Sequence, residues 1–98
     1  MTDRVVIAQL ARELGVPSLD VTIGLSQLRT VQLSNARVYE REKALLAMEA
    51  YYRRVMKENR QLYAERRGKS YRKRAEMYAN RLDIVMAAIH EWRVACGN

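Results

Sequence analysis

The sequence predicts an all-α protein built around a long antiparallel helical hairpin. Helix-forming residues dominate the 98 residues, and one proline and four glycines are the only strong interruptions. Apolar residues also recur at helical spacing through the second half of the chain. We therefore expect a single helical domain spanning 1–98, in which an N-terminal helix pair (1–33) precedes the hairpin (34–98).

The N-terminal pair is expected to form two short helices, at about 3–15 and 19–32. Each has one apolar face, and Gly15 is expected to end the first helix. Ser18 or Asp20 would cap the start of the second, and both helices would pack at one end of the hairpin. Their apolar positions are Val6, Ile7, Leu10, Ala11 and Leu14 in the first helix, and Val21, Leu25 and Leu28 in the second.

The first arm of the hairpin is predicted at about 35–67, because neither glycine nor proline occurs between Gly24 and Gly68. Such a helix would be about 50 Å long. Its apolar stripe is wider than one partner helix can cover, which favours a homo-oligomer. The stripe comprises Val38, Leu45, Met48, Tyr52, Val55 and Leu62, with Tyr39, Leu46, Met56 and Tyr63 at its edge.

The second arm is predicted at about 70–96, where apolar residues alternate at spacings of four and three. Ser70 is the expected N-cap and Gly97 the expected stop. Reflecting the chain about Gly68 brings the two seams together, so the arms should run antiparallel. The seam residues are Tyr71, Ala75, Tyr78, Leu82, Val85, Ile89, Trp92 and Cys96.

Positive charge is concentrated where the hairpin turns. The net charge of the chain is +7, but residues 53–74 alone carry ten cations against Glu58 and Glu65, so the remainder sums to −1. We call residues 53–74 the basic tip. Its cations are Arg53, Arg54, Lys57, Arg60, Arg66, Arg67, Lys69, Arg72, Lys73 and Arg74.

This concentration indicates a polyanionic partner. Arg72, Lys73 and Arg74 fall in the first turn of the second arm, where each cation opposes the helix dipole at a cost of roughly 0.3–1 kcal/mol. We therefore expect these ten cations to bind nucleic acid, DNA or RNA, with the arginines forming bidentate contacts to phosphate. Tyr63 and Tyr71 are candidates for stacking on unpaired bases, although packing within the hairpin would also explain them.

Two other interpretations of the tip remain open. An acidic protein partner would make this chain an interaction module, such as an adaptor, an inhibitor or a chaperone. A solvated surface or contact with anionic lipid would require no specific partner. Within the nucleic-acid hypothesis, an accessory or regulatory factor of a mobile element is one possible role, by analogy with small proteins that combine a helix-turn-helix with an oligomerising hairpin.

Residues 10–28, LARELGVPSLDVTIGLSQL, resemble the helix-turn-helix of DNA-binding regulators. Ala11, Gly15, Val16 and Val21 match the pattern, whereas Gly24 replaces an apolar residue. The resemblance implies that Ser18, Thr22, Ser26 and Gln27 face the groove. That face also contains Leu19, Asp20 and Ile23 and has no cation before Arg29, so two core helices joined by a proline turn are the alternative.

No pattern of catalytic or metal-binding residues occurs. His90 is the only histidine and Cys96 the only cysteine, so neither has a partner at metal-ligand spacing. We expect no enzymatic activity and no cofactor. The sequence contains no signal-peptide layout and no apolar run long enough to cross a membrane, so we expect a cytoplasmic protein.

Overall fold

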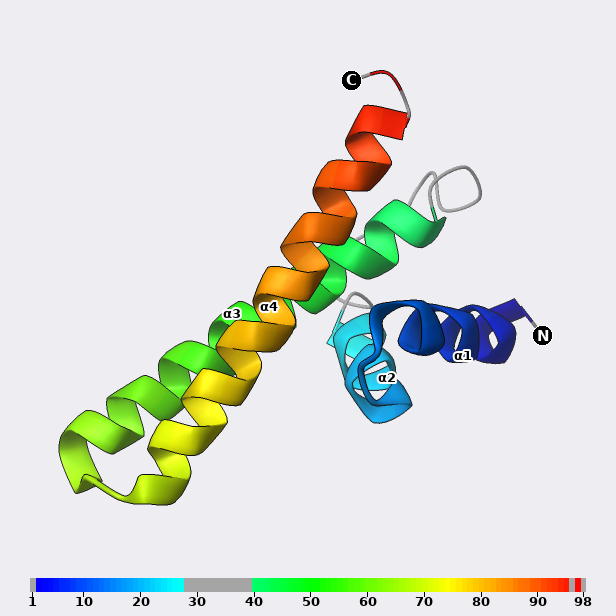
Figure 1. The fold of residues 1–98 in the computed structure, drawn as a ribbon. Helices are drawn as coiled ribbons and strands as arrows, with labels where there is room; N and C mark the ends of the chain where they lie inside the picture. Colours follow the sequence, from blue (N-terminus) through cyan, green and yellow to red (C-terminus); the bar gives the residue numbers. More distant parts are fainter. Residues whose placement is uncertain (1, 28–39, 96, 98) are drawn as a thin grey trace.

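The computed structural model describes the backbone of residues 2–27, 40–95 and 97, and the side chains of residues 7–26, 42–95 and 97. These residues form helices and contain no strand, which confirms the all-α prediction (Figure 1). The helices are α1 (Thr2–Leu14), α2 (Ser18–Gln27), α3 (Glu40–Arg66) and α4 (Lys69–Ala95).

The long helices α3 and α4 lie side by side and antiparallel, joined by a tight turn (Figure 1). Each contains 27 residues and is therefore about 40 Å long. The predicted arms, about 35–67 and 70–96, are confirmed over 40–66 and 70–95, and the second arm begins one residue earlier, at Lys69. Residues 35–39 and 96, and residues 28–32 of the predicted second short helix, lie outside the described residues.

The apolar seams of α3 and α4 form the core. Leu45, Met48, Tyr52 and Val85 are completely buried, and burial of such a side chain contributes roughly 1.5–3 kcal/mol. Met56, predicted at the edge of the stripe, is buried as part of the core. Further buried seam residues are Ala75, Leu82 and Ile89.

The end of α1 was predicted correctly and the start of α2 was not. Gly15 has a φ of 69°, and the N–H of Val16 donates to the Ala11 carbonyl at 3.1 Å, which closes the C-terminal turn of α1. The α2 helix then begins directly after Pro17, whose carbonyl accepts from the Asp20 N–H at 3.0 Å. Neither Ser18 nor Asp20 therefore precedes the helix as an N-cap.

A buried carboxylate fastens α2 to both arms of the hairpin. Asp20 is 6% exposed, and its Oδ2 atom accepts from the Tyr52 hydroxyl at 3.0 Å and from Arg81 Nη1 at 2.7 Å. Tyr52 belongs to α3 and Arg81 to α4, so one carboxylate connects three helices. These two hydrogen bonds stabilise the negative charge of the Asp20 carboxylate, whose burial without a partner would be unfavourable.

Gly24 lies where α2 packs against α3. A Cβ atom at Gly24 would lie 3.4 Å from Met48 Cγ and 3.6 Å from the carbonyl carbon of Ala47. The α3 residues that meet Gly24 and Asp20 of α2 are Ala47, Met48 and Tyr52, in the half of α3 that is far from the turn. The two short helices lie on one side of the hairpin, and the turn projects beyond them (Figure 1).

Candidate nucleic-acid interface

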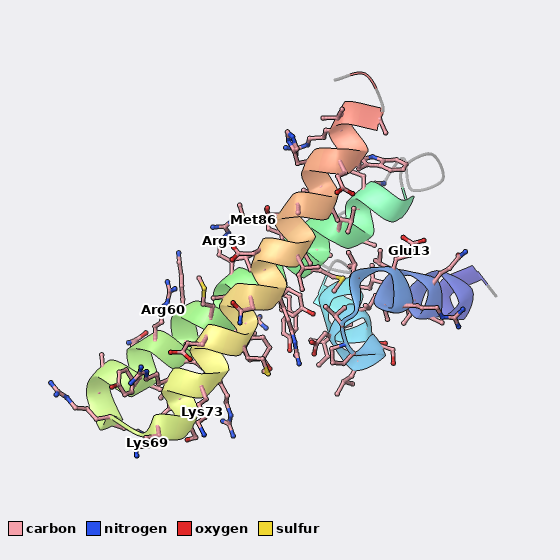
Figure 2. The ribbon with its side chains drawn as sticks, viewed as in Figure 1. Glu13, Arg53, Arg60, Lys69, Lys73 and Met86 are labelled. Carbon is pink, nitrogen blue, oxygen red and sulfur yellow. The ribbon has the colours of Figure 1, made fainter. Side chains whose placement is uncertain are left out.

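All ten cations of the basic tip are exposed to solvent. They come from the second half of α3, the turn and the first turns of α4, so the fold brings the two charged stretches of sequence together at one end of the molecule. Figure 2 shows Arg60, Lys69 and Lys73 extending outward from this end. The side chain of Arg72, for example, is 65% exposed.

Three of the cations form a stripe along α3. Arg53, Lys57 and Arg60 follow one another at spacings of four and three residues, which places them on one side of the helix. The Arg53 Nη2 atom also lies 3.8 Å from the sulfur of Met86 on α4, so the Arg53 end of this stripe lies next to α4. In Figure 2 the labelled Arg53, Arg60 and Met86 lie on the side of the hairpin opposite α1 and α2.

Few acidic groups neutralise the tip. Arg53 pairs with Glu49 at 3.8 Å, Arg54 with Glu58 at 3.7 Å, and Arg72 with Glu76 at 3.2 Å. All three pairs join residues four apart and are exposed, except that Glu49 is partly buried, and pairs of this type contribute little stability. Within the part of the chain that the structure describes, the other seven cations form no ion pair. They are Lys57, Arg60, Arg66, Arg67, Lys69, Lys73 and Arg74.

The turn between the arms places an arginine in an unusual backbone conformation. Arg67 has a φ of 53°, and its N–H donates to the Tyr63 carbonyl at 2.7 Å, so it occupies the left-handed position that usually carries glycine. Gly68 comes next, and its carbonyl accepts from the N–H of Tyr71 at 3.1 Å. Gly68 therefore caps α4, and the prediction of Ser70 as the N-cap was wrong because the helix begins at Lys69.

The two tyrosines of the tip have different surroundings. Tyr71 is half-buried; its hydroxyl lies 3.5 Å from Arg66 Nη1, and its ring would lie 3.1 Å from a Cβ atom at Gly68. Tyr71 thus packs on the turn. Tyr63 is 37% exposed. The sequence could not separate the two, because both lie at helical spacing among cations.

The segment that resembles a helix-turn-helix forms two helices joined at Gly15 to Pro17. Ser18, Thr22 and Ser26 are exposed, as the resemblance implies, and Gln27 has no described side chain. The hydroxyls of Thr22 and Ser26, however, donate to the carbonyls of Ser18 and Ile23 within α2 itself.

Asp20 was expected on the face that would read DNA, but its burial places it in the core. Arg81 donates to it, and the guanidinium also lies 5.7 Å from the Tyr78 ring centroid. Sequence reasoning missed this cluster. The available signal was that Asp20 lies next to Val21, an apolar position of the second helix that is completely buried.

The tyrosines around Asp20 are packed closely. The ring centroids of Tyr51 and Tyr52 are 5.5 Å apart, and those of Tyr52 and Tyr78 are 6.0 Å apart. Burial, together with the neighbouring Tyr78 and Asp20 groups, raises the pKa of Tyr51 to about 12. Burial and the hydrogen bond to Asp20 raise the pKa of Tyr52 even further. The side chains of this cluster contact one another inside the fold and are not available to a partner. The basic tip is therefore the main candidate for binding.

The remaining side chains offer no second site among the residues with described positions. His90 is exposed on α4, and no group of three histidine, cysteine or acidic side chains is arranged to hold a metal ion in that part of the chain. Cys96 lies outside the described residues. None of the described helices combines the length and the apolar character that crossing a membrane requires.

No known protein family, curated protein or solved structure matches this chain. The function is therefore inferred from the chemistry of the surface alone.

Proposed function

We propose that this protein binds nucleic acid, without catalysing a reaction, through the cations of the basic tip. The observation that carries the proposal is that seven exposed cations lack an acidic partner within the described residues and converge at one end of the hairpin. Phosphate groups supply the counter-charge that the fold does not, and the release of condensed cations from the nucleic acid favours binding.

The type of cation supports phosphate as the ligand. Five of the ten tip cations are arginines on α3 or in the turn, with exposed guanidinium groups that can form forked hydrogen bonds with phosphate. These residues are Arg53, Arg54, Arg60, Arg66 and Arg67.

The site of contact can be tested by neutralising two stripe cations. Fluorescence anisotropy would measure binding of labelled duplex DNA, single-stranded DNA and RNA between 50 and 200 mM salt. The Lys57→Ala/Arg60→Ala variant should bind all three more weakly and with a shallower salt dependence, because each lost phosphate contact lowers the slope of log K against log salt by roughly 0.7–0.9.

The matched control is Arg12→Ala/Arg93→Ala, which removes the same charge from exposed positions near the ends of α1 and α4. It should bind almost as well as the unaltered protein. Equal losses in the two variants would show that net charge, and not the tip, drives binding. If the unaltered protein binds no nucleic acid, the proposal fails, and an acidic protein becomes the partner to seek by pull-down.

We also propose that the protein self-associates as a cytoplasmic accessory or regulatory factor. Besides Tyr63, four large apolar side chains on α3 and α4 are exposed in the single chain, with Ile84 at 41% and Val94 at 61%. An oligomer that covers them would present several tips and raise the affinity through avidity. Sedimentation velocity should then give a mass of at least two chains. The other two side chains are Leu46 and Met86.

A further inference from the structure

Tyr63 differs from the other tyrosines that the structure describes. Tyr51, Tyr52 and Tyr78 contact one another in the core, and the Tyr71 hydroxyl meets Arg66. Within the described part of the chain, the Tyr63 side chain forms neither a ring contact nor a hydrogen bond, and it is 37% exposed. Part of the Tyr63 ring is therefore open to solvent and has no specific partner among the described residues.

The ring of Tyr63 lies between cations. Arg60 precedes it by three residues on α3, and Arg67 follows it by four residues in the turn, outside the helix. Lys57 and Arg53 continue the same series away from the turn. Of these cations, Lys57, Arg60 and Arg67 form no ion pair with described residues. An exposed aromatic ring near cations that lack acidic partners can hold a single strand, with a base stacked on the ring and phosphates paired with the cations.

The shape of the tip disfavours a duplex groove as the place where Tyr63 binds. Two packed helices present a face roughly 20 Å wide, whereas the major groove of B-DNA is about 12 Å wide. Insertion of α3 alone, by its outer edge, would bring the exposed carboxylates of Glu58 and Glu65 into the groove. A duplex can therefore meet the cations only through its backbone, where its paired bases offer Tyr63 no face.

From this geometry we propose that the basic tip selects single-stranded nucleic acid and stacks one unpaired base on Tyr63. This proposal rests on the proposed function, because it assumes that the tip binds nucleic acid. DNA and RNA share the chemistry concerned, since every base has a stacking face and every nucleotide a phosphate.

The test compares Tyr63→Ala, Tyr63→Phe and the unaltered protein by fluorescence anisotropy. The probes are a 20-nucleotide thymidine strand, the matching uridine strand and a 20-base-pair duplex. We expect Tyr63→Ala to bind both single strands about 5- to 100-fold more weakly, which corresponds to the loss of one stacked base. Tyr63→Phe should remain within about twofold of the unaltered protein, because the ring persists.

Two controls make the result specific. Duplex binding should change by less than about twofold in Tyr63→Ala, and the salt slope for the single strands should be unchanged, because stacking releases no counterion. Gln61→Ala, at an exposed position two residues away, should bind like the unaltered protein. Circular dichroism would verify that each variant retains its helical content.

The outcomes separate this proposal from the proposed function. If the protein binds strands and duplex equally and Tyr63→Ala changes neither, the tip binds nucleic acid but the stacking proposal is wrong. If Tyr63→Ala weakens strands and duplex to the same extent, the ring has no role specific to unpaired bases, and the proposal is also overturned. If no probe binds, the proposed function itself fails.

Discussion

Replacement of Asp20 by alanine is the most direct test of how the short helices are held on the hairpin. In the native chain one Asp20 oxygen accepts from the Tyr52 hydroxyl and from Arg81, which lie 32 and 61 residues away in the sequence. Asp20→Ala removes both acceptor interactions at once. The hydroxyl then has no partner in the core, and Arg81 loses its counter-charge.

The expected loss of stability follows from the burial of the three groups. Tyr52 is fully buried, and a buried hydroxyl left without a partner costs roughly 1–3 kcal/mol. The Arg81 side chain is 23% exposed, so water partly solvates it and the cost falls below the 3–5 kcal/mol typical of a broken buried pair. We expect Asp20→Ala to lower the free energy of unfolding by about 2–4 kcal/mol, a large share of the roughly 5–15 kcal/mol of a small domain.

Urea unfolding, followed by circular dichroism and by the fluorescence of Trp92, would measure this change as a shift in midpoint. Asp83→Ala removes an exposed carboxylate from α4 and is the matched control, with an expected change within about 0.5 kcal/mol. Tyr52→Phe completes a double-mutant cycle, in which Asp20 and Tyr52 should show a coupling energy of about 1 kcal/mol or more.

The reasoning would be refuted if Asp20→Ala destabilised the protein no more than Asp83→Ala does. Additive effects of Asp20→Ala and Tyr52→Phe would likewise show that the hydroxyl and the carboxylate do not stabilise one another in solution.

Three further predictions concern the turn, the helix crossing and alkaline pH. Arg67→Gly should raise the free energy of unfolding by about 1 kcal/mol, because glycine adopts the left-handed conformation without strain, and it should weaken nucleic-acid binding by removing a cation; a loss of stability in urea unfolding would contradict this. Gly24→Ala should stabilise α2 by up to about 1 kcal/mol, because the added Cβ lies at van der Waals distance from Met48; a midpoint shift toward lower urea would mean that the helices cross more closely. The contribution of Tyr51 to stability should be constant just below pH 10 and be lost between pH 10 and about 12, because an unfolded tyrosine ionises at 10.0 whereas the pKa of Tyr51 is raised to about 12. Ionisation followed at 295 nm should coincide with loss of helical signal, and full ionisation of all tyrosines in a still-folded protein would disprove the assignment.

The amino-acid sequence by itself determined the hairpin and the location of its charge. The alternation of four- and three-residue spacings is a local property of each helix, so the seam from Ala75 to Ile89 could be recognised without knowing what covers it. The ten cations of the basic tip are close in sequence, and the hairpin leaves them exposed at its turn.

Only the tertiary structure decided which of the candidate residues are buried and which are exposed. Asp20 is buried because α3 and α4 supply donors from positions remote in sequence, and no local pattern encodes such a meeting. The roles of Tyr63 and Tyr71 separated for the same reason: Tyr71 packs on the turn at Gly68, whereas Tyr63 meets no other aromatic side chain in the described structure. Helical periodicity fixes the side of a helix on which a residue lies, but burial depends on what the remainder of the chain places there.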